Sequence, residues 1–204
     1  MTIADSAHDW DESYAGPPPP WDIGRPQPAF AKLAEAGALT GALLDAGCGT
    51  GEHTILAACH GAGALGIDIS RRSIEMARRK SADRGIDARF RVSDARHLGT
   101  LGETFDTVID SGLFHVFDDD ARSQYVAGVS EVLREGGHLH LMCFSDCQPG
   151  DWGPRRVTED ELRTAFRSGW QIDSLTADRF DINPGLGMST AESWLLDAVR
   201  MRSR

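Results

Sequence analysis

The residues best suited to chemistry in this sequence form one glycine-rich stretch, Asp45-Ala46-Gly47-Cys48-Gly49-Thr50-Gly51-Glu52. Its three glycines at alternate positions predict a tight turn, because glycine accepts positive φ and lets a ligand approach the backbone closely. An apolar run over 42–44 precedes the turn and predicts a buried strand, and Glu52 opens an amphipathic helical pattern. Strand, turn and helix N-terminus together predict a site for one end of a nucleotide-like ligand.

The spacing of these glycines separates two classes of cofactor. A dinucleotide fingerprint, G-x-G-x-x-G, would need its third glycine where Glu52 stands, and that carboxylate would repel a pyrophosphate. The observed pattern D-x-G-x-G-x-G, from Asp45 to Gly51, resembles the first motif of class I S-adenosylmethionine-dependent methyltransferases. In that family the turn holds the methionine half of the cofactor. Taken alone, the motif also fits an ordinary tight turn between a strand and a helix.

Three more carboxylates follow at the expected ends of strands. Asp68 and Asp110 end two apolar runs, and Asp94 comes two residues after a third predicted strand, 88–92. Ligands of doubly wound sheets gather at the carboxyl ends of strands, where Asp68 can accept hydrogen bonds from both ribose hydroxyls. The resemblance places Asp94 at the adenine amino group and Asp110 beside the reactive methyl group, to orient the ammonium or ribose of the cofactor.

A narrower resemblance extends from about Trp10 to the C-terminus. The segment 20–28, PWDIGRPQP, resembles the P-W-D-x-G-R segment of thiopurine and thiol methyltransferase-like enzymes. Together with segments 108–115 and 153–158, it makes the chain similar to the heterocyclic toxin methyltransferases. This resemblance implies a Rossmann-like α/β fold with a seven-stranded, mostly parallel sheet, an antiparallel last strand and helices on both faces.

The resemblance also implies a role for the aromatic and proline-rich N-terminus, residues 1–26, here called the strap. It is expected to cover the cofactor cleft, with Trp21 packed on the cofactor. Arg25 is expected to pair with the methionine carboxylate, which suits its forked guanidinium, although a surface charge is the alternative. A disordered leader is the alternative for the whole strap.

The predicted cofactor is therefore S-adenosyl-L-methionine, with S-adenosyl-L-homocysteine as the product. The residues expected to contact it come from the strap, the glycine turn and the ends of the predicted strands. They are Trp21, Arg25, Asp45, Gly47, Cys48, Gly49, Thr50, Gly51, Asp68, Ile69, Asp94, Ala95, Asp110 and Ser111.

Methyl transfer from a sulfonium mainly requires that the nucleophile be held against the methyl group. A base helps a phenol or an amine, whereas an already ionised acceptor needs none. His115 is the best candidate for a general base, since imidazole titrates near neutrality, and Asp110 is the second catalytic candidate. A hydrogen bond to a loop carbonyl is the structural alternative for His115. The expected acceptor walls are Trp10, Tyr14, Phe114, His115, Trp152 and Met188, each of which could equally belong to the core.

Composition limits the class of protein. A chain of 204 residues suits one α/β core, so a single domain over 1–204 is expected. Hydrophobic residues at 41% and charged residues at 25% are ordinary for a soluble globular protein. No apolar run reaches membrane-spanning length, and the N-terminus lacks the pattern of a secretory signal. We therefore expect a cytoplasmic protein without a membrane partner.

The charge of the chain bears on its partners. A net charge of −10 disfavours nucleic acid, so the expected partner is a small-molecule methyl acceptor. The four cysteines show no C-x-x-C spacing, which favours free thiols in a reducing compartment. No metal site is expected, because His138 and His140 share one face of a predicted strand whereas Cys143 lies on the other. A monomer and a homodimer are both open.

The remaining elements follow from periodicity and capping signals. Ser70 and Thr158 are predicted N-caps, and Thr158 with Glu161 forms a capping box. Gly136-Gly137 is expected to end a helix before the fifth strand. The predicted helices are 27–39, 70–80, 118–133 and 158–166, and the later strands are 138–144, 170–182 and 191–201, the last two as an antiparallel hairpin.

Three functions are compatible with these residues. The leading hypothesis is a methyltransferase acting on an O, N or S nucleophile of a small aromatic heterocycle, such as a hydroxyquinolone. The second is a thiol or thiopurine S-methyltransferase. From another class come a nicotinamide oxidoreductase, disfavoured by Glu52, and a non-catalytic protein that binds an adenosine ligand.

Overall fold

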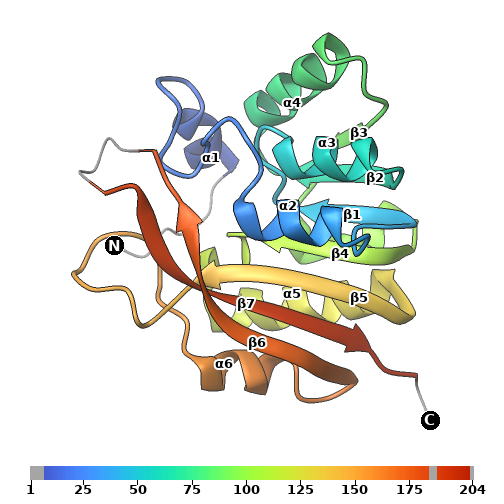
Figure 1. The fold of residues 1–204 in the computed structure, drawn as a ribbon, viewed down its shortest axis with the longest axis vertical. Helices are drawn as coiled ribbons and strands as arrows, with labels where there is room; N and C mark the ends of the chain where they lie inside the picture. The colour runs from blue at the N-terminus through green and yellow to red at the C-terminus, as the bar shows by residue number, and fades with distance from the viewer. Residues whose placement is uncertain (1–6, 184–187, 203–204) are drawn as a thin grey trace.

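The computed structural model describes residues 7–183 and 188–202. Its centre is a seven-stranded sheet with the strand order β3-β2-β1-β4-β5-β7-β6, and helices lie on both faces (Figure 1). β1 to β5 pair in parallel, whereas β7 runs antiparallel to both β5 and β6. The strands are β1 Ala42–Ala46, β2 Gly63–Asp68, β3 Arg89–Val92, β4 Phe105–Ser111, β5 Leu133–Phe144, β6 Trp170–Asp181 and β7 Thr190–Arg200. The predicted fold class is confirmed.

The helices follow the predicted order with some differences in length. They are α1 Ala7–Ser13, α2 Pro28–Glu35, α3 Glu52–Cys59, α4 Arg71–Asp83, α5 Asp119–Val132 and α6 Glu159–Ala165, with short 3₁₀ helices η1 Ala95–Leu101 and η2 Phe114–Val116. The Ser70 side chain accepts the N–H of Ser73 at 3.1 Å, and Thr158 and Glu161 form the capping box. Both predicted N-caps are therefore confirmed, whereas α1 was not predicted.

The start of β5 differs from the prediction. Gly136-Gly137 does not end a helix, because α5 already ends at Val132 and β5 begins at the next residue. Leu133 pairs with Phe105 and His138 with Thr107, so residues 134–137 stand opposite Asp106 alone. The glycines allow this irregularity, with Gly136 at φ 80°.

The central strands bury side chains on both faces, as parallel strands covered by helices do. Consecutive residues alternate between two apolar layers: Leu44 and Val108 pack toward α5, whereas Leu43 and Ile109 pack toward α2 and α3. This double burial leaves the carboxyl ends of the strands as the edge where polar groups can gather. None of the helices described is both long and apolar enough to cross a membrane.

Candidate active site

A cavity of about 510 Å³ opens at the carboxyl ends of β1 to β4. One part of its wall comes from the glycine turn after β1 and from the residues that follow β2 and β3. The other part comes from the 3₁₀ helix after β4, the ends of β5 and β6, and the loop that carries Trp152. We call the two parts the cofactor end and the acceptor end. Residues of the described part of the strap also line the cavity. In the view of Figure 1, α1 lies above the end of the sheet.

The glycine turn uses its glycines in two ways. A Cβ at Gly49 would lie 3.1 Å from the Tyr14 hydroxyl, so this glycine lets the strap come close to the turn. A Cβ at Gly51 would lie 2.8 Å from Ala77 Cβ and from the Phe90 ring. Gly51 does not line the cavity. It serves the packing of α3 against α4 and β3, which does not support the prediction that Gly51 contacts the cofactor.

Asp68 lies in the cavity wall at the end of β2, beside Ile69. One carboxylate oxygen accepts the N–H of Gly49 and the other accepts the N–H of Ser70, both at 2.9 Å. Burial raises the pKa of Asp68, while these two N–H donors favour its ionised form. Each oxygen keeps a second acceptor site, as a vicinal diol requires.

Asp94 and Ala95 line the same end after β3. The Asp94 carboxylate is engaged by Arg96, whose guanidinium reaches it at 2.6 Å and whose backbone N–H reaches it at 2.9 Å. Although burial opposes ionisation, Arg96 holds the pKa of Asp94 below its usual value. An adenine amino group at Asp94 would have to share this carboxylate with Arg96, a side chain that sequence reasoning missed.

Asp110 is placed differently from the prediction. It is fully buried below the cavity wall, where it accepts the N–H of Leu113 at 2.8 Å and the hydroxyl of Tyr125 at 2.9 Å. Burial raises its pKa to about 7, against the effect of these donors. Its bonds fix the turn after β4, and it does not line the cavity. A catalytic or cofactor-contacting Asp110 is therefore not supported.

Asp45 is also structural. Its carboxylate accepts the hydroxyl of Thr54 at 2.6 Å and is buried behind the glycine turn, where burial raises its pKa to about 7. Gly47, Cys48, Gly49 and Thr50, which were also predicted in this turn, do line the cavity, as does Ser111 after β4.

Three aromatic residues of the strap line the cavity: Trp10, Tyr14 and Trp21. Trp21 Nε1 donates a hydrogen bond to the Tyr14 hydroxyl at 3.1 Å, and the Trp10 and Trp21 rings meet edge to face at 6.0 Å. Because the Tyr14 hydroxyl faces Gly49, Tyr14 lies at the cofactor end, whereas the sequence predicted an acceptor wall. Trp10 and Tyr14 are half-buried, whereas Trp21 keeps 48% of its surface exposed, so only part of this apolar area is removed from water.

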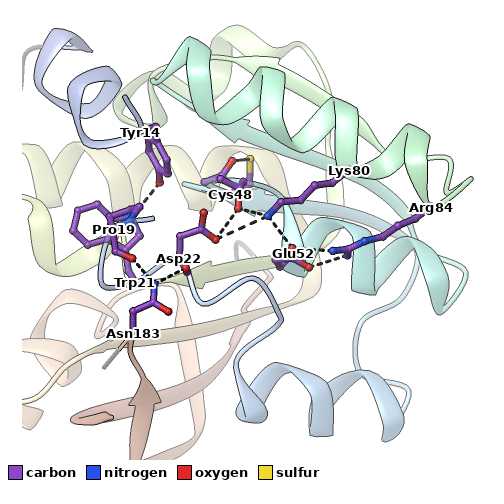
Figure 2. A network of polar contacts seen from close by, with 11 residues as sticks. Tyr14, Pro19, Trp21, Asp22, Cys48, Glu52, Lys80, Arg84 and Asn183 are labelled. Atoms are coloured by element: carbon purple, nitrogen blue, oxygen red, sulfur yellow. Dashed lines mark hydrogen bonds and ion pairs between the residues drawn. The ribbon is translucent and has the colours of Figure 1, made fainter. Parts of the chain in front are cut away.

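Polar contacts join the strap to the glycine turn (Figure 2). The Thr50 hydroxyl donates to Asp22 at 2.9 Å and accepts a hydrogen bond from Lys80 Nζ at 2.7 Å. Lys80 also donates to Glu52 at 2.8 Å, and Arg84 binds both oxygens of Glu52. Glu52, which the sequence suggested as the start of a helix and as an obstacle to pyrophosphate, thus lines the cavity and forms ion pairs with Lys80 and Arg84.

The other edge of the strap is joined to the end of β6. Asn183 Nδ2 donates to the carbonyls of Pro19 and Asp22, as Figure 2 shows, and Arg25 forms an ion pair with Asp181 at 2.7 Å. The Gln27 side chain pairs with the backbone N–H and C=O of Asp181. Arg25, predicted to bind the methionine carboxylate, is therefore partly engaged by Asp181 here.

The acceptor end is mainly aromatic. Phe144 contacts Trp152 edge to face at 5.4 Å, and His115 contacts both Phe144 and Phe180 in the same way. Of the predicted walls, His115 and Trp152 line the cavity here, and Trp10 and Tyr14 line it from the strap. Phe114 is instead buried in the core below the Arg122 guanidinium, and Met188 is not part of the cavity wall.

His115 is held as a neutral ring. Its Nδ1 accepts the backbone N–H of Phe144 at 2.9 Å, so the proton of the neutral ring is on Nε2. Burial lowers its pKa to about 3, and the charge of Arg122 acts in the same direction. A general base at neutral pH would need a free, basic nitrogen, so this geometry argues against the predicted role. His115 is placed instead to donate a hydrogen bond from Nε2.

The other acidic and basic groups around the cavity are also engaged. Every carboxylate in the described cavity wall has a hydrogen-bond donor: Asp22, Glu52, Asp68, Asp94 and Asp181. His53 accepts the N–H of Gln27 at 3.0 Å, and burial lowers its pKa to about 4. In the described wall every carboxylate and imidazole therefore already accepts a hydrogen bond, and both imidazoles are weak bases because burial lowers the pKa of His53 and of His115.

Several residues of the cavity wall were not predicted. They include Asp22, Gln27, Glu52, His53, Arg96, Phe144, Phe180, Asp181 and Ile182. Phe144 ends a predicted strand, as Asp68 and Asp110 do, so the rule used for the carboxylates could have found it. His53 lies in the first turn of the helix that follows the glycines, where the side chain can face the same ligand.

Comparison with known proteins gives one family model and several relatives. A model described as a methyltransferase domain matches residues 43–137. A 2-heptyl-1-hydroxyquinolin-4(1H)-one methyltransferase from Mycobacteroides abscessus is 33% identical, over 81% of this chain and 74% of that protein. A probable thiol methyltransferase 2 from Arabidopsis thaliana is 27% identical, over 93% of this chain and 85% of that protein.

One solved structure is similar along almost its whole length. It comes from work on the conversion of a disulfide bond into a thioacetal group during echinomycin biosynthesis. It is 35% identical to this chain, with a TM-score of 0.87 over 96% of this chain and 92% of that one. The likeness therefore extends well beyond the region that the family model matches.

Proposed function

The chain belongs to the class I S-adenosylmethionine-dependent methyltransferases and acts on a small molecule, and from this premise we propose the nature of its acceptor. The acceptor is a small aromatic heterocycle, such as a hydroxyquinolone, methylated on a nucleophile that is already ionised when it binds. The observation that carries this proposal is the acceptor end, with flat aromatic walls and no free base among the described residues. The hydroxyquinolone methyltransferase at 33% identity supports the same class of acceptor.

The residues of the cofactor end fit S-adenosylmethionine. When bound, this cofactor supplies a methyl group on a positively charged sulfur. We propose that the turn 47–50 holds its methionine half and that Asp68 accepts its ribose hydroxyls, because this carboxylate faces the cavity with acceptor capacity left. Asp94 with Ala95 then receives the adenine, and Tyr14 and Trp21 of the strap cover the ligand. Residues 1–204 act as one domain with the strap as its lid.

The acceptor end positions the nucleophile and removes water from it. Phe144, Trp152 and Phe180 offer apolar surface to a flat ring, and the Nε2–H of His115 can hold an oxygen of the acceptor. Holding the acceptor in line with the methyl group supplies most of what this displacement needs from a protein. Because the wall takes up no proton, the acceptor must lose its own before transfer. An N-hydroxy group or an acidic heteroaryl hydroxyl meets this condition, whereas a simple phenol or an amine does not.

A sulfur acceptor is the second candidate, and a specific observation favours it. The structural relative at 35% identity concerns chemistry at a disulfide, and the Arabidopsis relative is a probable thiol methyltransferase. A thiol ionises near neutral pH, so a wall without a base suits it as well. A nicotinamide oxidoreductase, the alternative from another class, is set aside by the family to which the chain belongs.

The direct test is turnover of a small panel by the full chain. S-adenosylmethionine with a labelled methyl group would be offered with a hydroxyquinolone, an aromatic thiol, an unactivated phenol and an aromatic amine, and the products identified by mass spectrometry. The proposal expects methylation of the hydroxyquinolone and slow or no reaction of the phenol and amine. Exclusive methylation of the thiol would favour the second candidate, and preference for the amine would contradict both.

A further inference from the structure

We propose that Lys80, a residue of α4 outside the cavity wall, is a positioning residue that fastens the strap over the cofactor end. It acts through Thr50 of the glycine turn and Asp22 of the strap. This inference concerns the retention of cofactor and does not depend on which acceptor is methylated.

The contacts of Lys80 set the direction of one hydroxyl group. Its ammonium lies 2.7 Å from the Thr50 hydroxyl, 2.8 Å from a Glu52 oxygen and 4.0 Å from an Asp22 oxygen (Figure 2). An ammonium only donates, so the Thr50 oxygen must accept from it. The single proton of that hydroxyl is then directed to Asp22, at 2.9 Å. Lys80 thereby aligns the bond that joins the turn to the strap.

The charges around this bond also indicate that Lys80 holds the strap in place. Asp22 and Glu52 present two carboxylates whose side chains are only 10% and 7% exposed. Lys80 contacts both of them, whereas Arg84 donates two hydrogen bonds to Glu52. Removing Lys80 would leave Glu52 paired but Asp22 without its nearby cation. A poorly solvated carboxylate without a cation is costly, and moving the strap outward would return Asp22 to water.

Asp22 also links the strap to both sides of the cavity. Its side chain is held at the glycine turn, and its backbone carbonyl accepts a hydrogen bond from Asn183 at 2.7 Å. Tyr14 and Trp21, on the same strap, face the cofactor end. Lys80 should therefore control how fast a bound cofactor leaves, although it does not line the cavity.

The test uses S-adenosylhomocysteine, so that no turnover is needed. Calorimetry would give its affinity and stopped-flow fluorescence its dissociation rate, for the full chain and for Lys80→Met. We expect an affinity about tenfold weaker, mostly through faster dissociation, because one aligned bond and one charge pair are lost. Lys80→Arg, which keeps the charge, should recover most of the affinity. Limited proteolysis of the complex should cut the strap faster in Lys80→Met.

Arg84→Met is the matched control, because it removes a cation from the same Glu52 without touching Thr50 or Asp22. It should bind S-adenosylhomocysteine within about twofold of the wild type. Equal losses in the two variants would show that Lys80 acts only through Glu52, and would overturn the proposal.

A second variant covers the case in which Lys80→Met is poorly folded. Thr50→Val removes the hydroxyl through which Lys80 acts and should weaken binding by a similar factor. If the two residues act in one chain of bonds, adding Lys80→Met to Thr50→Val should weaken binding little further. Fully additive losses, with thermal unfolding confirming folded variants, would contradict a shared role.

Discussion

The two ends of the cavity are formed by different kinds of groups. The cofactor end consists of backbone turns directly attached to β1, β2 and β3, with carboxylates held by N–H groups. The acceptor end consists of aromatic side chains from β5 and β6 and from the loop between Ser145 and Val157. The cofactor is shared by the whole family, so it can be bound by backbone groups that the fold itself supplies. Specificity for one acceptor depends instead on side chains, which the loops of each protein must position.

The difference extends to how each end is held. In the glycine turn, the N–H groups of Gly47 and Cys48 both donate to the carbonyl of Ile67, at 2.9 and 2.8 Å, so the turn is fixed to the neighbouring strand. At the acceptor end, the Arg156 side chain donates to the carbonyls of Gln148, Gly150 and Trp152. One flexible side chain thus organises the loop that carries an aromatic wall.

The largest expected effect lies at the cofactor end. Asp68→Ala removes the proposed acceptor of two ribose hydroxyls and should weaken S-adenosylhomocysteine binding by at least about 150-fold, because the two bonds to a charged group contribute roughly 1.5–3 kcal/mol each. Calorimetry measures the affinity. The exposed Asp173 of β6, changed to Ala, is the control and should leave binding unchanged. Unaltered affinity in Asp68→Ala would remove this residue from the site.

The next largest effect is expected from a change at the acceptor end alone. His115→Ala should lower kcat/KM for a hydroxyquinolone about tenfold, since a hydrogen bond to an ionised oxygen is lost, and leave S-adenosylhomocysteine affinity within about twofold. Steady-state kinetics and calorimetry separate the two quantities. Because the pKa of His115 lies near 3, the variant should not change the pH profile above pH 5. A pH-dependent step that vanishes with the side chain would instead identify His115 as the base.

A smaller effect should come from the loop. Arg156→Ala frees the carbonyls around Trp152 and should raise the acceptor KM several-fold, about fivefold, with little change in kcat or in cofactor affinity, because a less ordered wall must be ordered on binding. Arg156→Lys should restore part of the loss. Arg163→Ala, which breaks only a surface pair with Glu159, is the control. A fall in kcat at unchanged KM would contradict a role in shaping the wall.

The smallest effect on ligand binding should come from Asp45, which lies behind the turn. Asp45→Asn should leave S-adenosylhomocysteine affinity within about twofold, because the carboxylate does not line the cavity. Its effect should appear in stability, as a different dependence on pH.

Burial raises the pKa of Asp45 in the folded chain to about 7, well above the ordinary value of an aspartate carboxyl group. The folded state retains the proton, so this residue's contribution to stability is complete below about pH 4 and is lost as pH rises through 7. Asp45→Asn should flatten that decline, by an amount on the order of 2 kcal/mol. Urea unfolding at pH 5 and at pH 7.5 measures the change in the free energy of unfolding between these two pH values. An equal change in the wild type and in Asp45→Asn would show that Asp45 is ionised in the folded state.

The sequence predicted the cofactor end better than the acceptor end for a physical reason. The bounds of β2, the N-cap at Ser70 and the placement of Asp68 depend on periodicity and turn chemistry within a few residues. Asp110 follows the same local rule, yet its carboxylate turns inward to Tyr125, which no local pattern reveals. Position in a strand predicts where a residue lies, but not which way its side chain points after a turn.

The missed residues depend on contacts between distant parts of the chain. Lys80 meets Thr50 across two elements, and Gln27 meets Asp181 from the other end of the sequence. Phe180 joins the acceptor end only because the β6–β7 hairpin returns beside β5. Such pairings become visible only when the sheet order is known.

The most direct test of the account is the pH dependence of kcat/KM for hydroxyquinolones that differ in acidity. With no base in the described wall, the account predicts that each acceptor's rate rises with its own ionised fraction, so the midpoint moves with the acceptor's pKa. The midpoints should be the same in the wild type and in His115→Ala. One common midpoint for all acceptors, lost in His115→Ala, would show that the enzyme supplies the base and contradict the account.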